Sequence, residues 1–234
     1  MKTFNDLQEG LNDPNIFKAF FLAGGPGSGK SYVVRKTTGG TGLRIVNSDD
    51  VFEKYLKDAG LEMDMRTRQA EREEEERDKL RKRAKTLTKK RQANYLEGRI
   101  GLIIDGTGKD YDKIAKQSIQ LRQLGYDTHM IFVNTSLDVA LARNAKRERS
   151  VSNSVATNSW RAVQSNIGKF SQHFRQNFVV VDNNDADIKD PQIFNDVFKQ
   201  IKGLLKKKVK SPIAKQWVMQ QMKDRGITRM PKGF

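Results

Sequence analysis

Residues 18–39 read KAFFLAGGPGSGKSYVVRKTTG, and this stretch decides the fold. A short apolar run, AFFLA at 19–23, is followed by the glycine-rich segment GGPGSGKS at 24–31. That segment matches the pattern G-x-x-x-x-G-K-[ST] at every fixed position, and a helical pattern follows it as far as Gly39. A strand, a glycine-rich turn and a helix in this order predict a phosphate-binding loop, because the glycines let backbone N–H groups surround phosphate oxygens at a helix N-terminus.

The glycine-rich segment therefore predicts a binding site for a nucleoside triphosphate. Lys30 is expected to reach the β- and γ-phosphates, and the hydroxyl of Ser31 is expected to ligate Mg²⁺. The strand before the segment and the helix after it make a chance glycine-rich turn a poor alternative. The residues expected to bind the nucleotide are Gly25, Pro26, Gly27, Ser28, Gly29, Lys30 and Ser31.

Five short apolar runs predict the fold class. Each run is continuous, not alternating, which is typical of strands buried on both faces of a parallel sheet. Helical patterns separate the runs, so the sequence predicts an α/β fold with right-handed crossovers, although not the order of its strands. The expected strands are Ala19–Ala23, Leu43–Val46, Ile100–Ile104, His129–Val133 and Phe178–Val181.

Composition narrows the class of protein. The 234 residues include 44 Lys and Arg against 28 Asp and Glu, and the resulting net charge of +16 favours a polyanionic partner. The absence of cysteine excludes disulfides and thiolate metal sites, and two histidines are too few for a multi-histidine metal site. No apolar run approaches the length of a membrane span. We expect a soluble protein of the cytoplasm (the host cytoplasm if a phage encodes it) with no membrane partner.

Two segments carry unusual charge. Residues 62–98 form a long charged stretch in which acids at 71–76 precede bases at 79–91, an order that suits the helix dipole. This charged excursion is either a solvated helix or a projecting helix that binds substrate through a basic face. Residues 206–234 contain nine basic residues against one acidic residue. Both segments are candidate surfaces for nucleic acid.

The basic C-terminal tail, 206–234, is expected to follow a domain that spans 1–205. Ser211 and Pro212 predict the start of a short helix within the tail, and Gly226 predicts its end. A narrow apolar stripe on this helix could dock on the body of the protein or on a partner. The stripe consists of Ile213, Trp217, Val218 and Met222.

A third candidate group lies in GLIIDGTGKD at 101–110. Asp105 comes at the carboxyl end of an expected strand, where ligands gather in open α/β sheets, so it could orient Mg²⁺ through water. Thr107 could hold a nearby phosphate or a group of the substrate. The alternative is that Asp105 and Gly106 form only a turn. No glutamate follows Asp105 directly, which argues against a hydrolytic motor.

Two adjacent aspartates end the second expected strand. Asp50 and Glu53 have the spacing of a capping box, so Asp50 is expected to start the next helix. Asp49 would then be free to accept the proton of an attacking hydroxyl during phosphoryl transfer. The alternative makes Asp49 the helix cap and leaves Asp50 in solvent.

A basic helix and a polar loop predict a lid. Arg143 and Arg147 lie one helical turn apart, residues 150–158 are polar, and a new helix is expected near Ser159. Lid helices over 137–176 could close over the nucleotide and supply positive charge in the transition state. Arg149 and Arg161 are further candidates, and the alternative is that the arginines are simply solvated.

The four motifs together resemble the P-loop kinases of the zeta-toxin and phage polynucleotide 5′-kinase group. The resemblance covers about residues 16–200 and includes GGPGSGKS, NSDD, LIIDGTG and LARNAKR. It implies a doubly wound P-loop kinase fold, ATP with Mg²⁺ as the donor and a hydroxyl as the acceptor. It also implies roles for Lys30 and Ser31 on phosphate and magnesium, for Asp49 as the catalytic base, and for Arg143 and Arg147 as the lid arginines. The long excursion, the basic tail and the absence of a following phosphatase half depart from the group.

Two classes of function follow. The first is an ATP-dependent kinase that transfers the γ-phosphoryl group to a hydroxyl, either at a polynucleotide 5′-end, which the charge favours, or on a nucleotide-sugar. The second is an ATP-binding protein that binds nucleic acid or acts in assembly, with the P-loop as a switch.

Overall fold

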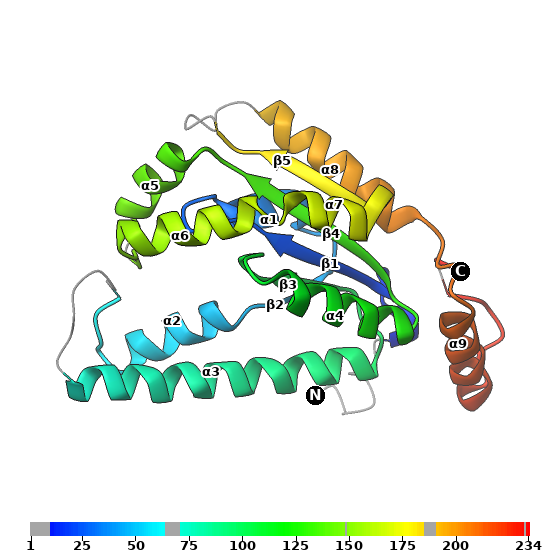
Figure 1. Cartoon of the computed structure of the whole chain (residues 1–234). Helices are drawn as coiled ribbons and strands as arrows, with labels where there is room; N and C mark the ends of the chain where they lie inside the picture. Colours follow the sequence, from blue (N-terminus) through cyan, green and yellow to red (C-terminus); the bar gives the residue numbers. More distant parts are fainter. Residues whose placement is uncertain (1–9, 64–70, 148, 185–190, 232) are drawn as a thin grey trace.

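The computed structural model describes residues 10–63, 71–147, 149–184, 191–231 and 233–234. Its centre is a five-stranded sheet in the order β2-β3-β1-β4-β5, and every neighbouring pair is parallel (Figure 1). This confirms the predicted α/β class and supplies the strand order. The strands are β1 Lys18–Ala23, β2 Arg44–Val46, β3 Leu102–Asp105, β4 Asp127–Asn134 and β5 Phe178–Asp182.

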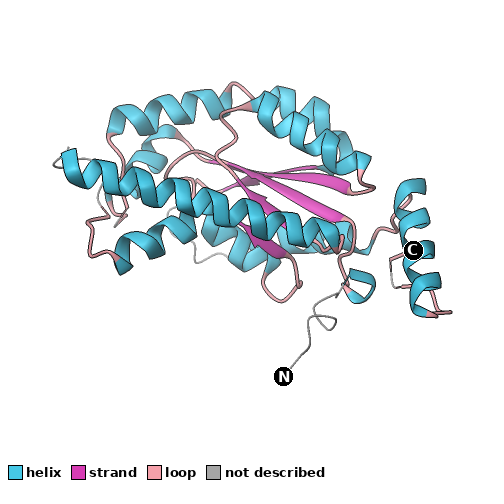
Figure 2. Cartoon of the chain, turned by 90° about the horizontal axis from the view of Figure 1, so that it is seen from below, coloured by secondary structure: helices cyan, strands magenta, loops and turns pink. Residues whose placement is uncertain are grey.

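Helices cover both faces of the sheet, so that the strands lie between two helical layers (Figure 2). Helices α1 and α8 pack on one face, and α4 and α7 pack on the other, which makes the fold doubly wound. The helices are α1 Lys30–Thr38, α2 Ser48–Asp58, α3 Glu71–Glu97, α4 Tyr111–Gln123, α5 Leu137–Ala145, α6 Asn153–Gln164, α7 Ile167–Phe174, α8 Pro191–Lys206 and α9 Pro212–Arg225, with short 3₁₀ turns η2 Gly10–Asn12 and η3 Arg175–Asn177.

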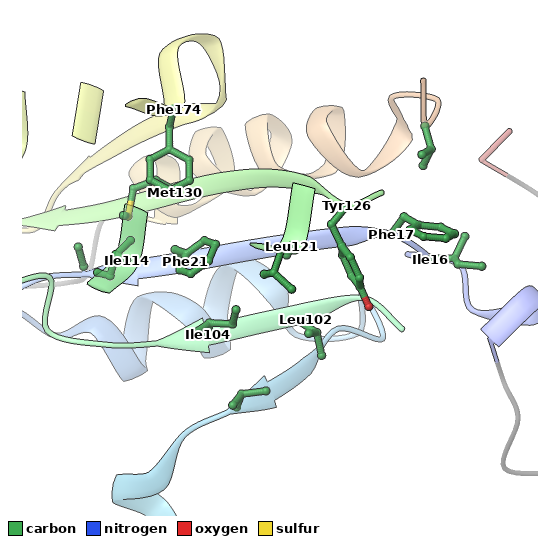
Figure 3. Packing of buried hydrophobic residues seen from close by; sticks show 14 of the residues in the cluster. Ile16, Phe17, Phe21, Leu102, Ile104, Ile114, Leu121, Tyr126, Met130 and Phe174 are labelled. Carbon is green, nitrogen blue, oxygen red and sulfur yellow. The ribbon is translucent and has the colours of Figure 1, made fainter. Parts of the chain in front are cut away.

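Two hydrophobic clusters explain why the apolar runs are continuous. Along β1, Phe20 and Leu22 face α1 and α8, while Phe21 faces α4 and α7. Phe20, Phe21 and Leu22 are all at most 1% exposed. Figure 3 shows Phe21 in the cluster that also contains Met130 and Phe174. Because successive side chains of a strand point to opposite faces, burial on both faces requires an unbroken apolar run.

The charged excursion is largely one long helix that lies beside α2 (Figures 1 and 2). Phe52 and Leu56 of α2 pack with Ala84 of α3 in a small buried cluster. The guanidinium of Arg81 lies 4.6 Å from the centre of the Phe52 ring. One face of α3 therefore stabilises α2, and Tyr95 and Leu96 at its C-terminal end pack against the main core cluster. Residues 64–70 of the predicted excursion lie outside the described residues.

The C-terminal segment docks on the body of the protein. This was one of the two alternatives for its apolar stripe, the other being a partner. Trp217 packs edge-to-face on Phe17 with ring centres 5.5 Å apart, and Val218 is fully buried. The buried ammonium of Lys18 donates a hydrogen bond of 2.7 Å to the carbonyl of Lys207. The prediction for Ile213 is wrong, because its side chain is 47% exposed and the next residue along the helix is buried in its place.

The second lid helix begins earlier than predicted. Helix α6 starts at Asn153, not near Ser159, because the Ser152 hydroxyl accepts a hydrogen bond of 3.4 Å from the Val155 N–H and caps the helix. Most of the expected polar loop is therefore helical. Within the described ranges, the helices are too short or too polar to cross a membrane.

Candidate active-site cleft

The phosphate-binding loop leaves the carboxyl end of β1 and is held by neighbouring elements. Gly24 N–H donates to the carbonyl of Thr107 at 2.9 Å, and the Asn183 side chain donates to the carbonyl of Ser28 at 2.7 Å. Gly27 has φ 78°, and a Cβ there would lie 1.9 Å from the carbonyl oxygen of Ala140 in α5. Glycine is required at this position because both the backbone conformation and the contact with α5 exclude a side chain.

The side chain of Lys30 turns back into the loop. Its ammonium donates to the carbonyl of Gly24 at 2.6 Å and lies 3.5 Å from that of Gly25. Burial lowers the pKa of Lys30, and the nearby carboxylate of Asp105 opposes this shift. Ser31 follows in the first turn of α1 and lines the same cleft. Both residues therefore line the cleft beside the loop, and their roles on phosphate and metal stay predictions of the motif.

Asn47 connects the carboxylates at the ends of β2 and β3. Its side-chain N–H₂ donates to Asp105 at 3.0 Å and to Asp50 at 2.9 Å. Its side-chain oxygen accepts from the N–H of Asp49 at 2.7 Å and caps α2. The prediction that Asp50 caps this helix is therefore wrong, and so is the alternative that Asp49 does. Both aspartates lie in the first turn because a better-placed cap precedes them.

Like charges and burial shift the acidity of these carboxyl groups. Burial raises the pKa of Asp105, and the charge of Lys30 opposes the increase. Burial also raises the pKa of Asp50, with further increases from the neighbouring carboxylates of Glu53 and Asp49. The donors of Asn47 and the ammonium of Lys30 partly offset the repulsion within this group.

Arg149 joins the lid side of the cleft to α2. Its guanidinium lies 3.3 Å from a carboxylate oxygen of Asp49 and 2.9 Å from one of Glu53. Arg143 is directed differently, since it donates to the backbone carbonyl of Asn183 at 2.7 Å. Arg161 is not among the described residues that line the cleft.

The cleft has a volume of about 630 Å³ and lies at the carboxyl ends of the strands. It brings together Lys30, Asp49, Asp105, Arg143 and Arg147, which the sequence had placed in four separate motifs. The predicted loop residues line it as well, except that Ser28 is buried beneath it. The loop residues in its wall are Gly25, Pro26, Gly27, Gly29, Lys30 and Ser31.

Comparison of the whole sequence with known protein families supports the kinase-like geometry of the cleft. The sequence model of the family described as Zeta toxin matches residues 6–195. The chain belongs to the zeta toxin family. No curated protein sequence matches it.

Solved structures share the fold of this zeta toxin family protein at low sequence identity. The PezAT toxin–antitoxin system of Streptococcus pneumoniae is 13% identical with a TM-score of 0.55, covering 88% of this chain and 99% of that chain. A candidate kinase of Chloroflexus aurantiacus is 15% identical with a TM-score of 0.53, covering 82% and 97%. The AvrRxo1-ORF1:-ORF2 complex with ATP is 14% identical with a TM-score of 0.53, covering 76% of this chain and 61% of that chain. At these identities the likeness establishes a P-loop kinase fold alone.

The donor groups of this zeta toxin family protein fit a magnesium nucleotide. In the part of the chain that the structure describes, no cluster of three or more His, Cys, Asp or Glu side chains could hold a metal by itself. The oxygen donors that line the cleft include the hydroxyl of Ser31 and the carboxylate of Asp105. A hard cation held by one hydroxyl and one carboxylate needs phosphate oxygens and water to complete its coordination, which is the usual situation of Mg²⁺ bound with a nucleotide.

Sequence reasoning missed three functional candidates in the cleft, namely Asn47, Glu53 as a partner of Arg149, and Asn183. Asn47 carried a usable signal, because asparagine is among the strongest N-cap residues and precedes a helical pattern. Asn183 had no such signal. It acts on the phosphate-binding loop only because β5 and β1 end at the same edge of the sheet.

Proposed function

We propose that this protein is an ATP-dependent kinase that transfers the γ-phosphoryl group to a hydroxyl of a nucleotide-sugar. The observation that carries the proposal is the convergence, in one cleft, of a phosphate-binding loop with carboxylates from β3 and α2 and arginines from the lid. Membership of the zeta toxin family supports phosphoryl transfer. A related fold solved with ATP supports ATP as the donor.

The nucleotide would be held by the loop. Backbone N–H groups of the loop and the ammonium of Lys30 would bind the β- and γ-phosphates, and Ser31 and Asp105 would hold Mg²⁺. Bound Mg²⁺ would neutralise charge on the phosphates. Arg143 and Arg147 line the lid side, where positive charge stabilises the transferring group.

The acceptor hydroxyl would attack the γ-phosphorus while Asp49 takes its proton. A new bond forms between the acceptor oxygen and the γ-phosphorus, the bond to the β-phosphate oxygen breaks, and ADP leaves. We assign the role of base to Asp49, whose carboxylate is 55% exposed beside the cleft and lies next to the guanidinium of Arg149. Asp50 instead accepts a hydrogen bond from Asn47.

The position of the basic segment supports a small acceptor over a polynucleotide 5′-end. Half of the net charge of +16 that favoured a polynucleotide lies in residues 206–234, which pack beside Lys18 at the start of β1. The phosphate-binding loop begins at the other end of β1, and the six residues of that strand span roughly 20 Å. The charge of the tail is thus remote from the transferring phosphate.

The test is transfer of labelled γ-phosphate from ATP to nucleotide-sugars, nucleosides and 5′-hydroxyl oligonucleotides, offered in parallel. We expect transfer to a nucleotide-sugar and its loss in Lys30→Ala, which removes the charge on the β- and γ-phosphates. Transfer only to oligonucleotides would move the acceptor to the polynucleotide end. Phosphate release without transfer to any acceptor would contradict the kinase and favour a nucleotide-driven switch.

A further inference from the structure

A second cleft lies at the edge of the sheet opposite to the phosphate-binding loop. It has a volume of about 500 Å³ and is formed by the segment before β1, the turn between α1 and β2, the end of α8 and the C-terminus. Two lysines line it, Lys202 and Lys206, and none of the described residues in its wall is acidic. This differs from the candidate active-site cleft, whose wall contains four carboxylates as well as six cationic side chains.

An aromatic ring and a glycine-rich turn give this cleft a shape suited to a planar group. Phe198 is half-buried in its wall, and the ammonium of Lys202 lies 4.2 Å from the centre of the ring. Gly40 also lines the cleft, with φ 74°, and no atom beyond its chain neighbours lies within 4 Å of the position that a Cβ would take. A ligand can therefore approach the backbone of this turn closely while it contacts the aromatic ring.

A fixed run of lysines extends the positive charge beyond the cleft. Lys206, Lys207 and Lys208 are exposed, but the backbone that carries them is anchored on both sides. The buried ammonium of Lys18, paired with Asp127 at 2.7 Å, also donates to the carbonyl of Lys207. Immediately after the run, the buried Val209 donates its N–H to the carbonyl of Gly233 at 2.8 Å. These cations are thus presented by an ordered surface.

We propose that this second cleft binds single-stranded nucleic acid. A base would stack on Phe198, and phosphates on either side of it would contact Lys202, Lys206 and the following lysines. Aromatic stacking combined with a cationic groove is how proteins bind single strands without reading their sequence. A cleft of this volume holds about one or two nucleotides, so the lysines outside it favour a strand over a mononucleotide. The inference does not depend on the proposed kinase function, because the two clefts share no lining residue.

Fluorescence anisotropy with a labelled single-stranded oligonucleotide tests the proposal. The double variant Lys202→Glu with Lys206→Glu should weaken binding at least tenfold and reduce the salt dependence, because fewer counterions are released. The matched control reverses the charge of two exposed lysines outside both charged segments, Lys54→Glu of α2 with Lys116→Glu of α4, and should change the Kd much less. Equal weakening by both double variants would overturn the proposal in favour of general electrostatic attraction.

The aromatic contact is tested separately. Phe198→Ala should weaken binding by about 5- to 150-fold, the range for one stacked base, whereas Phe198→Tyr should retain it. Thermal melting of each variant checks that the fold is intact. Equal affinity of the tyrosine and alanine variants, binding of duplex as tightly as single strand, or no binding at low salt would each overturn the proposal. Lys30→Ala should bind the oligonucleotide normally, which separates failure of this inference from failure of the kinase proposal.

Discussion

Replacing Asn47 with aspartate perturbs the carboxylate group of the candidate active site while keeping the helix cap. Aspartate caps a helix about as well as asparagine, so the acceptor for the N–H of Asp49 is retained. The variant loses the N–H₂ group that donates to Asp50 and Asp105, and it places a third carboxylate about 3 Å from both. The change is therefore nearly isosteric and purely electrostatic.

The expected magnitude follows from the two lost hydrogen bonds. A bond to a charged, mostly buried carboxylate is worth about 1.5–3 kcal/mol, and the bond to the exposed Asp50 is worth less because solvent screens it. We expect Asn47→Asp to reduce the free energy of unfolding by about 2–4 kcal/mol near neutral pH. Asn47→Ala should also destabilise the protein, through loss of the cap and of both donors.

The dependence on pH distinguishes the two variants. The pKa values of Asp50 and Asp105 are raised on folding, so the folded state binds protons more tightly than the unfolded state. The contribution of these two groups to the stability of the folded state is present at low pH and is lost as the pH rises through the raised pKa. An added carboxylate raises these pKa values further. Asn47→Asp should therefore lose much more stability at roughly pH 8 than at roughly pH 5.

Urea unfolding of the ligand-free protein at the two pH values measures this directly. The control is Ser152→Asp, which puts the same residue at the N-cap of α6, a helix with no acidic residue in its first turn. We expect the control to be close to neutral at both pH values. If Asn47→Asp loses the same stability at both pH values, the electrostatic interaction of residue 47 with Asp50 and Asp105 is refuted.

Three further predictions concern the base, the buried histidine and the C-terminal helix. Asp49→Asn should keep ATP binding but lower phosphoryl transfer by roughly 10²- to 10⁴-fold, whereas Asp50→Asn should have little effect on transfer. Single-turnover kinetics measure both effects, and the opposite pattern would exchange the roles of the two aspartates. Burial lowers the pKa of His129 from 6.5 to about 3, so stability should fall as the pH drops below 6.5, and His129→Phe should flatten that loss in acid unfolding curves. Trp217→Ala should cost about 2–3 kcal/mol, while Met219→Ala, at a residue 62% exposed, should stay within about 0.5 kcal/mol. Equal melting temperatures for the last two variants would contradict the docking of α9.

The sequence by itself determined the features that depend on local pattern. Continuous apolar runs predicted all five strands. The central strands are apolar because both of their faces are buried, whereas the edge strands β2 and β5 leave Ile45 and Val180 exposed. The segment ending in Lys30 and Ser31 predicted the phosphate-binding loop. This motif is local, because it is defined by glycines within a few residues of one another and by the strand and helix on either side. Asp105 and Asp49 were predicted to lie near the loop because the carboxyl ends of parallel strands meet at one edge.

Only the tertiary structure decided which residues meet across the chain. The pairing of Arg149 with Asp49 and Glu53 joins segments about a hundred residues apart, and no local pattern specifies it. The strand order, the bridge from Asn47 to Asp105 and the anchoring of Lys207 by Lys18 are likewise long-range contacts. Charge patterns predicted a basic tail, but its helix docks because burying Val218 and packing Trp217 on Phe17 removes apolar surface from water. That gain exists only once the sheet has formed the surface on which the helix packs.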